Sequence, residues 1–168
     1  MKKAIFSIFT VIILISSGFS QSLPVAPKPM KHVNDLSNML TLSERDSLEQ
    51  KLTTYKAQNN IDIYIVSFDS LCGYTSKIFA KKLQKKWNLS PKKLKNTAFI
   101  FIKPTGNSGE RYLYIAVSKD LESAIPDSIL LDIADKILIP NFKNKLYYQG
   151  FNIATQNIKE SVIKANSK

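Results

Sequence analysis

Apolar residues recur along this chain at two spacings, one typical of strands and one typical of helices. Three segments are rich in β-branched and aromatic side chains and have the length of a strand: residues 61–68, 97–102 and 111–117. The first begins in strict alternation. The second is apolar throughout, which suits a central strand with both faces covered. Turn-forming residues at 104–109 separate the second segment from the third and predict a hairpin.

Apolar residues at helical spacing surround these strands. Thr41 and Glu44 form the Thr-x-x-Glu pattern of a capping box, which predicts a helix from there to about Gln58. Its expected inward face is Leu48, Leu52 and Tyr55. A second helix is predicted over 75–87, with an inward face of Ile78, Phe79, Leu83 and Trp87.

Two further helices are predicted in the last third of the chain. The third helix begins with Asp127 or Ser128 as its cap, and Pro140 ends or kinks it. The last helix covers 147–164. Its expected inward face is Phe151, Ala154, Ile158 and Val162. The predicted order is helix, strand, helix, strand, strand, helix, helix.

This order predicts an α/β fold with a mixed sheet. A strand, helix and strand in succession imply a parallel pair joined by a right-handed crossover, and the hairpin makes the third strand antiparallel to the second. The end of the third strand therefore shares a sheet edge with the starts of the other two. We expect Lys95 and Asn96 to lie near residues 119–122 and Asp69 to lie at the opposite edge.

The N-terminus has the pattern of an export signal. A short basic start is followed by an apolar run and small residues, so we predict a signal peptide over 1–20, cleaved after Ser20. The alternative is an uncleaved membrane anchor, for which the apolar run is short. Residues 21–31 are proline-rich and predict a linker, and 32–165 form the folded domain. We expect the mature chain to be exported, periplasmic or secreted, without a transmembrane span.

The charge of the chain is strongly positive and unevenly placed. The formal net charge is +11, and loss of Lys2 and Lys3 with the signal leaves +9. Export makes nucleic acid an unsuitable partner, so an anionic membrane surface or an envelope protein is expected instead. The plainer alternative is a solvated helix face. The lysines that form this patch are Lys77, Lys81, Lys82, Lys85 and Lys86, followed by Lys92, Lys93 and Lys95.

Most catalytic chemistry is poorly supported by the sequence. His32 is the only histidine and Cys72 the only cysteine, and no Gly-x-Ser-x-Gly elbow occurs. With five glycines in the chain, phosphate-binding loops are also absent from the sequence. We expect His32 to be an ordinary surface or linker residue and Cys72 to be a small, partly buried apolar side chain.

Oxygen ligands remain as candidates for a hard cation such as calcium. They cluster around the end of the third strand, where carboxylate and amide oxygens could surround Ca²⁺. The candidate metal ligands are Asn96, Asp120, Glu122 and Asp127. The alternatives are a solvated acidic loop and, for Asp127, a helix cap.

Several short motifs, in order, resemble the TPM-domain family over about residues 31–163. The motifs are 33–35 with Leu40 and the capping box, 85–89, 120–122 with 125–127, and 139–142 with Tyr147 and Gly150. The resemblance implies a Rossmann-like three-layer α/β sandwich flanked by about four helices, in an exported setting. It also implies either a calcium-binding acid phosphatase or a non-enzymatic accessory domain, since the family contains both.

The chain departs from the family pattern at its acidic motifs. Lys95 stands where the family has an acid, and Ser118 and Asp120 replace two glycines. Asp35 either belongs to the family's site or orders the turn before the first helix, and we favour the second reading. The lysines at these motifs could pair with Asp120 or Glu122 and compete with a bound cation. We therefore predict a non-enzymatic interaction module of the cell envelope, with a divalent cation, calcium, as an optional ligand. The alternative is a calcium- or metal-dependent acid phosphatase.

Overall fold

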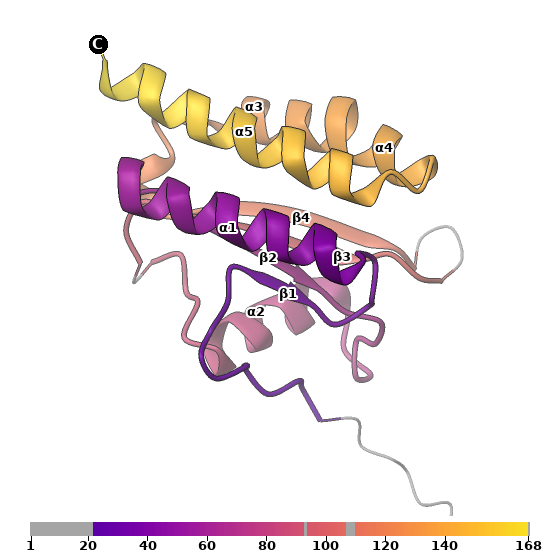
Figure 1. The fold of residues 1–168 in the computed structure, drawn as a ribbon. Coiled ribbons are helices and arrows are strands. Elements are labelled where there is room, and N and C mark those ends of the chain that lie inside the picture. The colour runs from indigo at the N-terminus through magenta and orange to yellow at the C-terminus, as the bar shows by residue number, and fades with distance from the viewer. Residues whose placement is uncertain (1–21, 93, 107–109, 168) are drawn as a thin grey trace, which may run out of the picture.

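A four-stranded mixed sheet forms the centre of the protein (Figure 1). The computed structural model describes residues 22–92, 94–106 and 110–167, so the predicted signal peptide and Lys93 lie outside the described residues. The strands are β1 (Val33–Asp35), β2 (Asp62–Ser67), β3 (Thr97–Lys103) and β4 (Tyr112–Val117), in that spatial order. β1, β2 and β3 are parallel and β4 is antiparallel to β3. The predicted crossover and hairpin are both confirmed.

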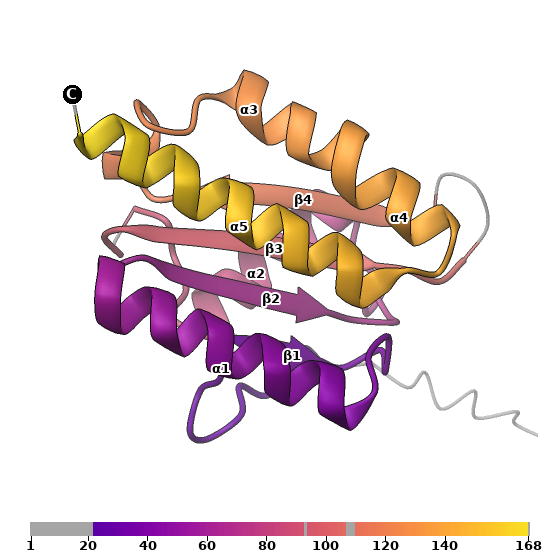
Figure 2. The same cartoon turned by 45° about the horizontal axis from the view of Figure 1, so that its top comes forward.

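Helices cover both faces of this sheet (Figure 2). On one face lie α1 (Leu42–Asn59), α5 (Tyr147–Asn166) and a third helical run. That run consists of α3 (Asp127–Asp132), a π-helical turn (Ile133–Leu138) and α4 (Ile139–Lys143). On the other face lies α2 (Ser76–Lys86). The predicted three-layer α/β architecture is therefore confirmed.

Two cores of different character lie on the two faces. The core under α1 and α5 is mostly aliphatic and includes the predicted faces of both helices, among them Leu48, Leu52, Ile158 and Val162. The core under α2 is mostly aromatic. Its buried aromatic residues are Phe68, Phe79, Trp87, Phe99 and Phe101. Because successive strand residues point to opposite faces, β3 supplies both cores and is buried along six of its seven residues.

The predicted element order missed a strand and misplaced one helix face. The strand β1 is only three residues long, too short to show any alternation. In α2, Ile78 is 46% exposed and Ala80 is buried instead. The buried residues of α2 are Phe79, Ala80, Leu83 and Gln84, and of these Phe79 and Leu83 pack in the aromatic core.

The helix after β4 also differs from the prediction. Its N-cap is Pro126, and Asp127 lies in the first turn without a capping bond, so neither predicted cap is correct. Pro140 does not end the helix. Proline has no N–H for the preceding turn, and the chain widens into a π-helical turn just before it. The side chain of Asn141 then donates to the Ile137 carbonyl at 2.7 Å.

The predicted linker lies against the domain. Leu23, Ala26 and Met30 pack against the aromatic core under α2. The indole N–H of Trp87 donates to the Pro24 carbonyl at 2.9 Å, and Lys86 Nζ donates to the Leu23 carbonyl at 2.6 Å. Within the described ranges, every helix is too short or too polar to cross a membrane.

Candidate functional site

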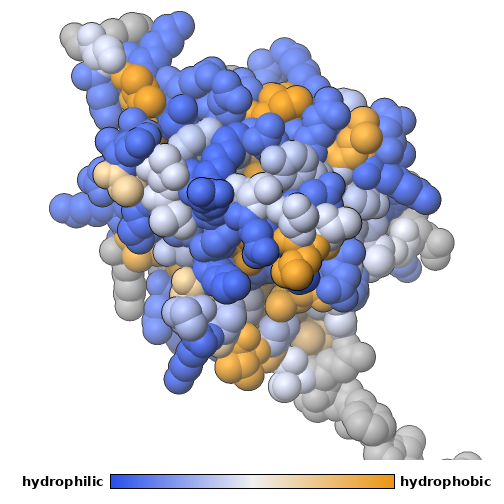
Figure 3. Space-filling model, in the orientation of Figure 1, coloured by the Kyte–Doolittle hydropathy of each residue, from blue (hydrophilic) through white to orange (hydrophobic). Residues whose placement is uncertain are grey.

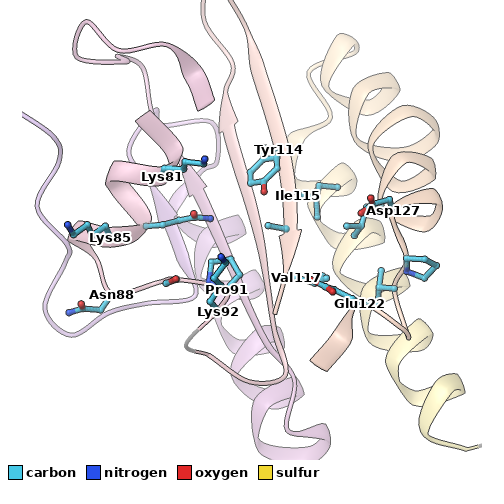
Figure 4. Close-up of a pocket in the computed structure, with 16 residues that line it drawn as sticks. Lys81, Lys85, Asn88, Pro91, Lys92, Tyr114, Ile115, Val117, Glu122 and Asp127 are labelled. Carbon is cyan, nitrogen blue, oxygen red and sulfur yellow. The ribbon is translucent and has the colours of Figure 1, made fainter. Parts of the chain in front are cut away.

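An open groove of about 1200 Å³ runs along β4 (Figure 4). One wall comes from α2 and the loop that follows it. The other wall comes from the segment between β4 and the middle of α3. The strand β4 lies between the two walls (Figure 4) and contributes Tyr114, Ile115, Ala116 and Val117. The face of the protein in Figure 3 is mostly hydrophilic, and its apolar patches are separate from one another.

The lysine patch divides between this groove and other contacts. Lys81 and Lys85, one helical turn apart, line the α2 wall together with Lys92. Lys81 points toward Tyr114 on β4 (Figure 4). Lys82 instead lies 4.9 Å from the centre of the Tyr74 ring, and Lys86 binds the Leu23 carbonyl. Lys77 is exposed on α2 one turn before Lys81 and is not among the residues that line the groove.

The candidate metal ligands fall into two pairs. The backbone N–H of Asn96 donates to Asp120 Oδ2 at 2.7 Å, so the structure brings these two residues together as the topology predicted. Glu122 and Asp127 are both exposed and line the groove opposite Lys81 (Figure 4). Asn96 and Asp120 are not among the residues that line it.

Asp120 performs a structural task at the start of β3. Partial burial acts to raise its pKa. Hydrogen bonds from Ser118 and the Asn96 backbone and the charge of Lys95 outweigh burial and lower the pKa below its usual value. In the described ranges, no three His, Cys, Asp or Glu side chains gather as a metal site requires. Calcium binding therefore stays a prediction.

Asp35 orders the turn before α1. It is the last residue of β1 and is 8% exposed. One carboxylate oxygen accepts from the Met39 N–H at 3.1 Å and from the Ser67 hydroxyl, and the other accepts from the Leu40 N–H at 2.9 Å. These bonds tie β1, β2 and the turn before α1 together, which is the role that we favoured for Asp35.

His32 is not an ordinary surface residue, and the prediction for it was wrong. Its Nδ1 lies 3.0 Å from Glu49 Oε1 and its Nε2 lies 3.0 Å from Asp62 Oδ1. The hydrogen bond to Asp62 is the largest influence and raises the pKa of His32 above its usual value, although burial opposes it. The ring is also stacked on Tyr64 at 5.5 Å. Its partners are distant in sequence, so no local signal could have revealed them.

Sequence reasoning also missed Gln84 and Tyr114, which line the groove. Gln84 is only 9% exposed, and its amide nitrogen is buried without a hydrogen-bond partner in the described part of the chain. A glutamine on the apolar face of a helix, directly after Leu83, was the available signal. Tyr114 is 42% exposed although it lies within a strand of apolar residues, and only the fold shows that it belongs to an edge.

Comparison with known proteins gives a family and a fold. The family model for the TPM domain matches residues 33–161. The solution structure of the N-terminal domain of a protein from P. gingivalis is similar, with a TM-score of 0.67 and 18% identity over 80% of this chain and 83% of that one. The N-terminal domain of a Corynebacterium glutamicum protein has a TM-score of 0.57 and 16% identity, covering 90% and 87%. These identities support likeness of fold alone. No curated protein matches the chain significantly.

Proposed function

This chain belongs to the TPM-domain family, and from that premise we propose that it acts as an exported, non-enzymatic interaction module of the cell envelope. The observation that carries the proposal is the groove along β4. Cationic side chains line one wall and carboxylates line the other, with an apolar strand between them. Such a groove offers charge complementarity at its rims and burial at its centre, as protein-binding surfaces do.

The histidine and the cysteine of this chain lie away from the groove. His32, the only histidine, is held between Glu49 and Asp62 near β1. Cys72, the only cysteine, packs against the aromatic core and is not among the groove residues. A general base beside a nucleophile is the usual requirement of covalent hydrolysis. This separation supports binding over covalent catalysis as the task of the groove.

A concave groove favours an envelope protein over a membrane surface as the partner. A flat anionic bilayer would engage the most protruding lysines and would gain nothing from Glu122 and Asp127, which line the opposite wall. A protein segment can place charges of both signs against the two walls. Export itself is part of the proposal and rests on the signal pattern of residues 1–20.

Capture from envelope extracts with matched charge variants tests this function. The purified protein should retain an envelope protein, and Lys81→Glu with Lys85→Glu should release it. Lys145→Glu with Lys164→Glu changes the net charge equally at exposed positions outside the groove and should leave capture intact. Equal loss in both double variants would indicate attraction by net charge alone and would contradict the groove. Binding of the same variants to anionic vesicles distinguishes a membrane partner.

A metal-dependent phosphatase is the second candidate, and one observation favours it. Glu122 and Asp127 line the same groove, where a cation could bridge them to a phosphate ester. A calcium titration followed by backbone amide shifts tests this idea. Saturable shifts at Glu122 and Asp127, lost in Asp127→Asn, would favour the phosphatase. Phosphate-ester turnover that survives Asp127→Asn and Asp120→Asn would reject these ligands.

A further inference from the structure

The outer edge of β4 carries backbone groups that have no hydrogen-bond partner among the described residues. The Ser118 N–H donates to the Thr97 carbonyl at 2.7 Å, so the backbone groups of Ser118 point toward β3. Because antiparallel residues alternate, Tyr112, Tyr114 and Ala116 also point their N–H and C=O groups toward β3. Leu113, Ile115 and Val117 therefore point theirs outward. β4 is the last strand on this side of the sheet, and in the described residues no other strand pairs with it.

This edge lacks the features that usually protect an edge strand. Natural edges are kept short, covered, bulged or supplied with lysine or proline. β4 is six residues long with the sequence YLYIAV, which contains no charge and no proline. Its groove leaves the edge open between α2 and α3 (Figure 4). An open, uncharged edge of this length is a template for another strand.

We propose that β4 accepts an extended acidic segment of a partner protein as a fifth, antiparallel strand of the sheet. This inference deepens the proposed function, on which it rests, by naming the chemistry of the partner. The backbone of the segment would bond to Leu113, Ile115 and Val117. A segment of about six to eight residues spans the length of β4.

The two walls of the groove set a side-chain pattern for this segment. Residues of an added strand point alternately toward the α2 wall and the α3 wall. Those facing α2 meet Lys81, Lys85 and Lys92, so acidic side chains suit them. Those facing α3 meet Ile125 and Leu130, with Glu122 and Asp127 at the rim, so apolar or basic side chains suit them. The occupant is therefore acidic at every second position.

Gln84 is a further reason to expect a hydrogen-bond acceptor on the face of the added strand that lies toward α2. Its amide nitrogen is buried and has no hydrogen-bond partner in the described part of the chain, although Gln84 lines the groove. An unsatisfied buried donor is unfavourable. A carboxylate or carbonyl of the added strand would provide the missing acceptor.

A second copy of this chain is a poorer occupant. Two antiparallel β4 strands related by a two-fold axis would keep the same faces of the two sheets on the same side. The α2 lysines of one copy would then lie beside the α2 lysines of the other, and like charges would repel. An acidic segment meets the same wall with attraction.

Hydrogen exchange of the β4 amides tests strand addition directly. The probe is a synthetic peptide of about eight residues with Glu at every second position and Val and Lys alternating between them. In the free protein, the Leu113, Ile115 and Val117 amides should exchange faster than those of Tyr114 and Ala116. With the peptide, the first three should become at least about tenfold more protected. Binding without added protection at these three amides would overturn the proposal.

Backbone methylation of the peptide gives a matched control. In an antiparallel addition, the residues that bond to β4 share the α3 face with Ile115. N-methyl groups on the Val and Lys positions should abolish binding, whereas N-methyl groups on the Glu positions should leave it within about threefold. Equal sensitivity, or none, to the two methylation patterns would contradict a paired strand. Lys81→Glu with Lys85→Glu should weaken the unmodified peptide about tenfold, and Lys145→Glu with Lys164→Glu should not.

The two proposals fail in different ways. If envelope capture depends on Lys81 and Lys85 but the peptide gives no protection of β4, strand addition is wrong and the interaction module stands. If the peptide pairs with β4 but no envelope protein is captured, strand addition stands and the proposed function fails. Protection of the β4 amides at high protein concentration without peptide would identify a second copy as the occupant and overturn the acidic partner.

Discussion

At one edge of the sheet, β1 offers three residues, and a carboxylate from α1 already occupies its outer side. Glu49 Oε2 accepts from the Val33 N–H at 2.8 Å, and Glu49 Oε1 accepts from the His32 N–H at 3.1 Å. At the other edge, β4 offers six residues whose outer N–H groups have no such acceptor in the described part of the chain. One edge is closed by side chains and the other is left open.

The side chains of the two edges differ in burial over the first half of β4. All three residues of β1 are buried, and Asp35 bonds its end to β2 and to the turn before α1. In β4, the first three residues are partly covered or exposed, with Tyr114 at 42%, whereas Ile115, Ala116 and Val117 are buried. Exposed edges favour pairing with other chains, so natural proteins block them unless pairing is useful. We infer from this difference that β1 contributes to stability and that β4 is available for contact with other chains.

Proline substitutions on β4 should change the free energy of unfolding most. They also show which backbone N–H groups of β4 have no hydrogen-bond acceptor. Tyr114→Pro removes an N–H that bonds to β3, so it should lower the free energy of unfolding by about 3 kcal/mol more than Tyr114→Ala. Leu113→Pro removes an outward N–H and should cost only about 1 kcal/mol more than Leu113→Ala. Urea denaturation measures both differences. Equal losses would mean that the outer edge of β4 is not open.

Asp35→Ala should weaken the closed edge. The change leaves the Met39 and Leu40 N–H groups and the Ser67 hydroxyl without their acceptor, so we expect a loss of about 2–4 kcal/mol. Glu122→Ala, a carboxylate removed from the open side, should change stability by less than about 0.5 kcal/mol. Chemical denaturation of the two variants at neutral pH gives the comparison. A small loss for Asp35→Ala would show that β1 is held by backbone pairing alone.

The smallest expected effect is a dependence of the free energy of unfolding on pH, caused by His32 directly before β1. Its pKa is raised in the folded state, so its contribution is complete below about pH 6.5 and is lost as the pH rises through the folded pKa. The ring faces Glu49, Asp62 and Tyr64. Burial acts to raise the pKa of Asp62, but hydrogen bonds from His32 and Lys56 outweigh it and lower that pKa below its usual value. Burial raises the pKa of Tyr64 to about 12. Lys56 also belongs to this cluster, with its Nζ against the other carboxylate oxygen of Asp62.

The measurement is the midpoint of thermal unfolding at about pH 6 and about pH 9. The natural protein should lose stability toward the higher pH, and His32→Gln should lose less. An equal change in both proteins would assign the pH dependence elsewhere. Glu49→Gln removes one of the charges that raises the His32 pKa and should also reduce the pH dependence. It replaces one of two accepting oxygens with an amide nitrogen, so it is compared with itself at the two pH values and not with the natural protein at one pH.

Much of this fold could be predicted from local patterns. The three longer strands, the capping box at Thr41 and the inward faces of α1 and α5 depend on residues close in sequence. The meeting of Asn96 with Asp120 followed from strand directions alone. By contrast, β1 is formed by pairing with β2 and by bonds to Glu49, which no short segment can report.

The sequence by itself determined the α/β class, the order of most elements and a basic helix. Each follows from a period of two or of 3.6 residues, or from a count of charges. The tertiary structure decided that Lys81 and Lys85 line a groove while Lys82 and Lys86 turn elsewhere, and that β4 is an open edge. Whether a strand lies at an edge, and whether that edge is covered, depends on which segments pack beside it. Those segments come from distant parts of the chain, so the candidate site exists only after folding.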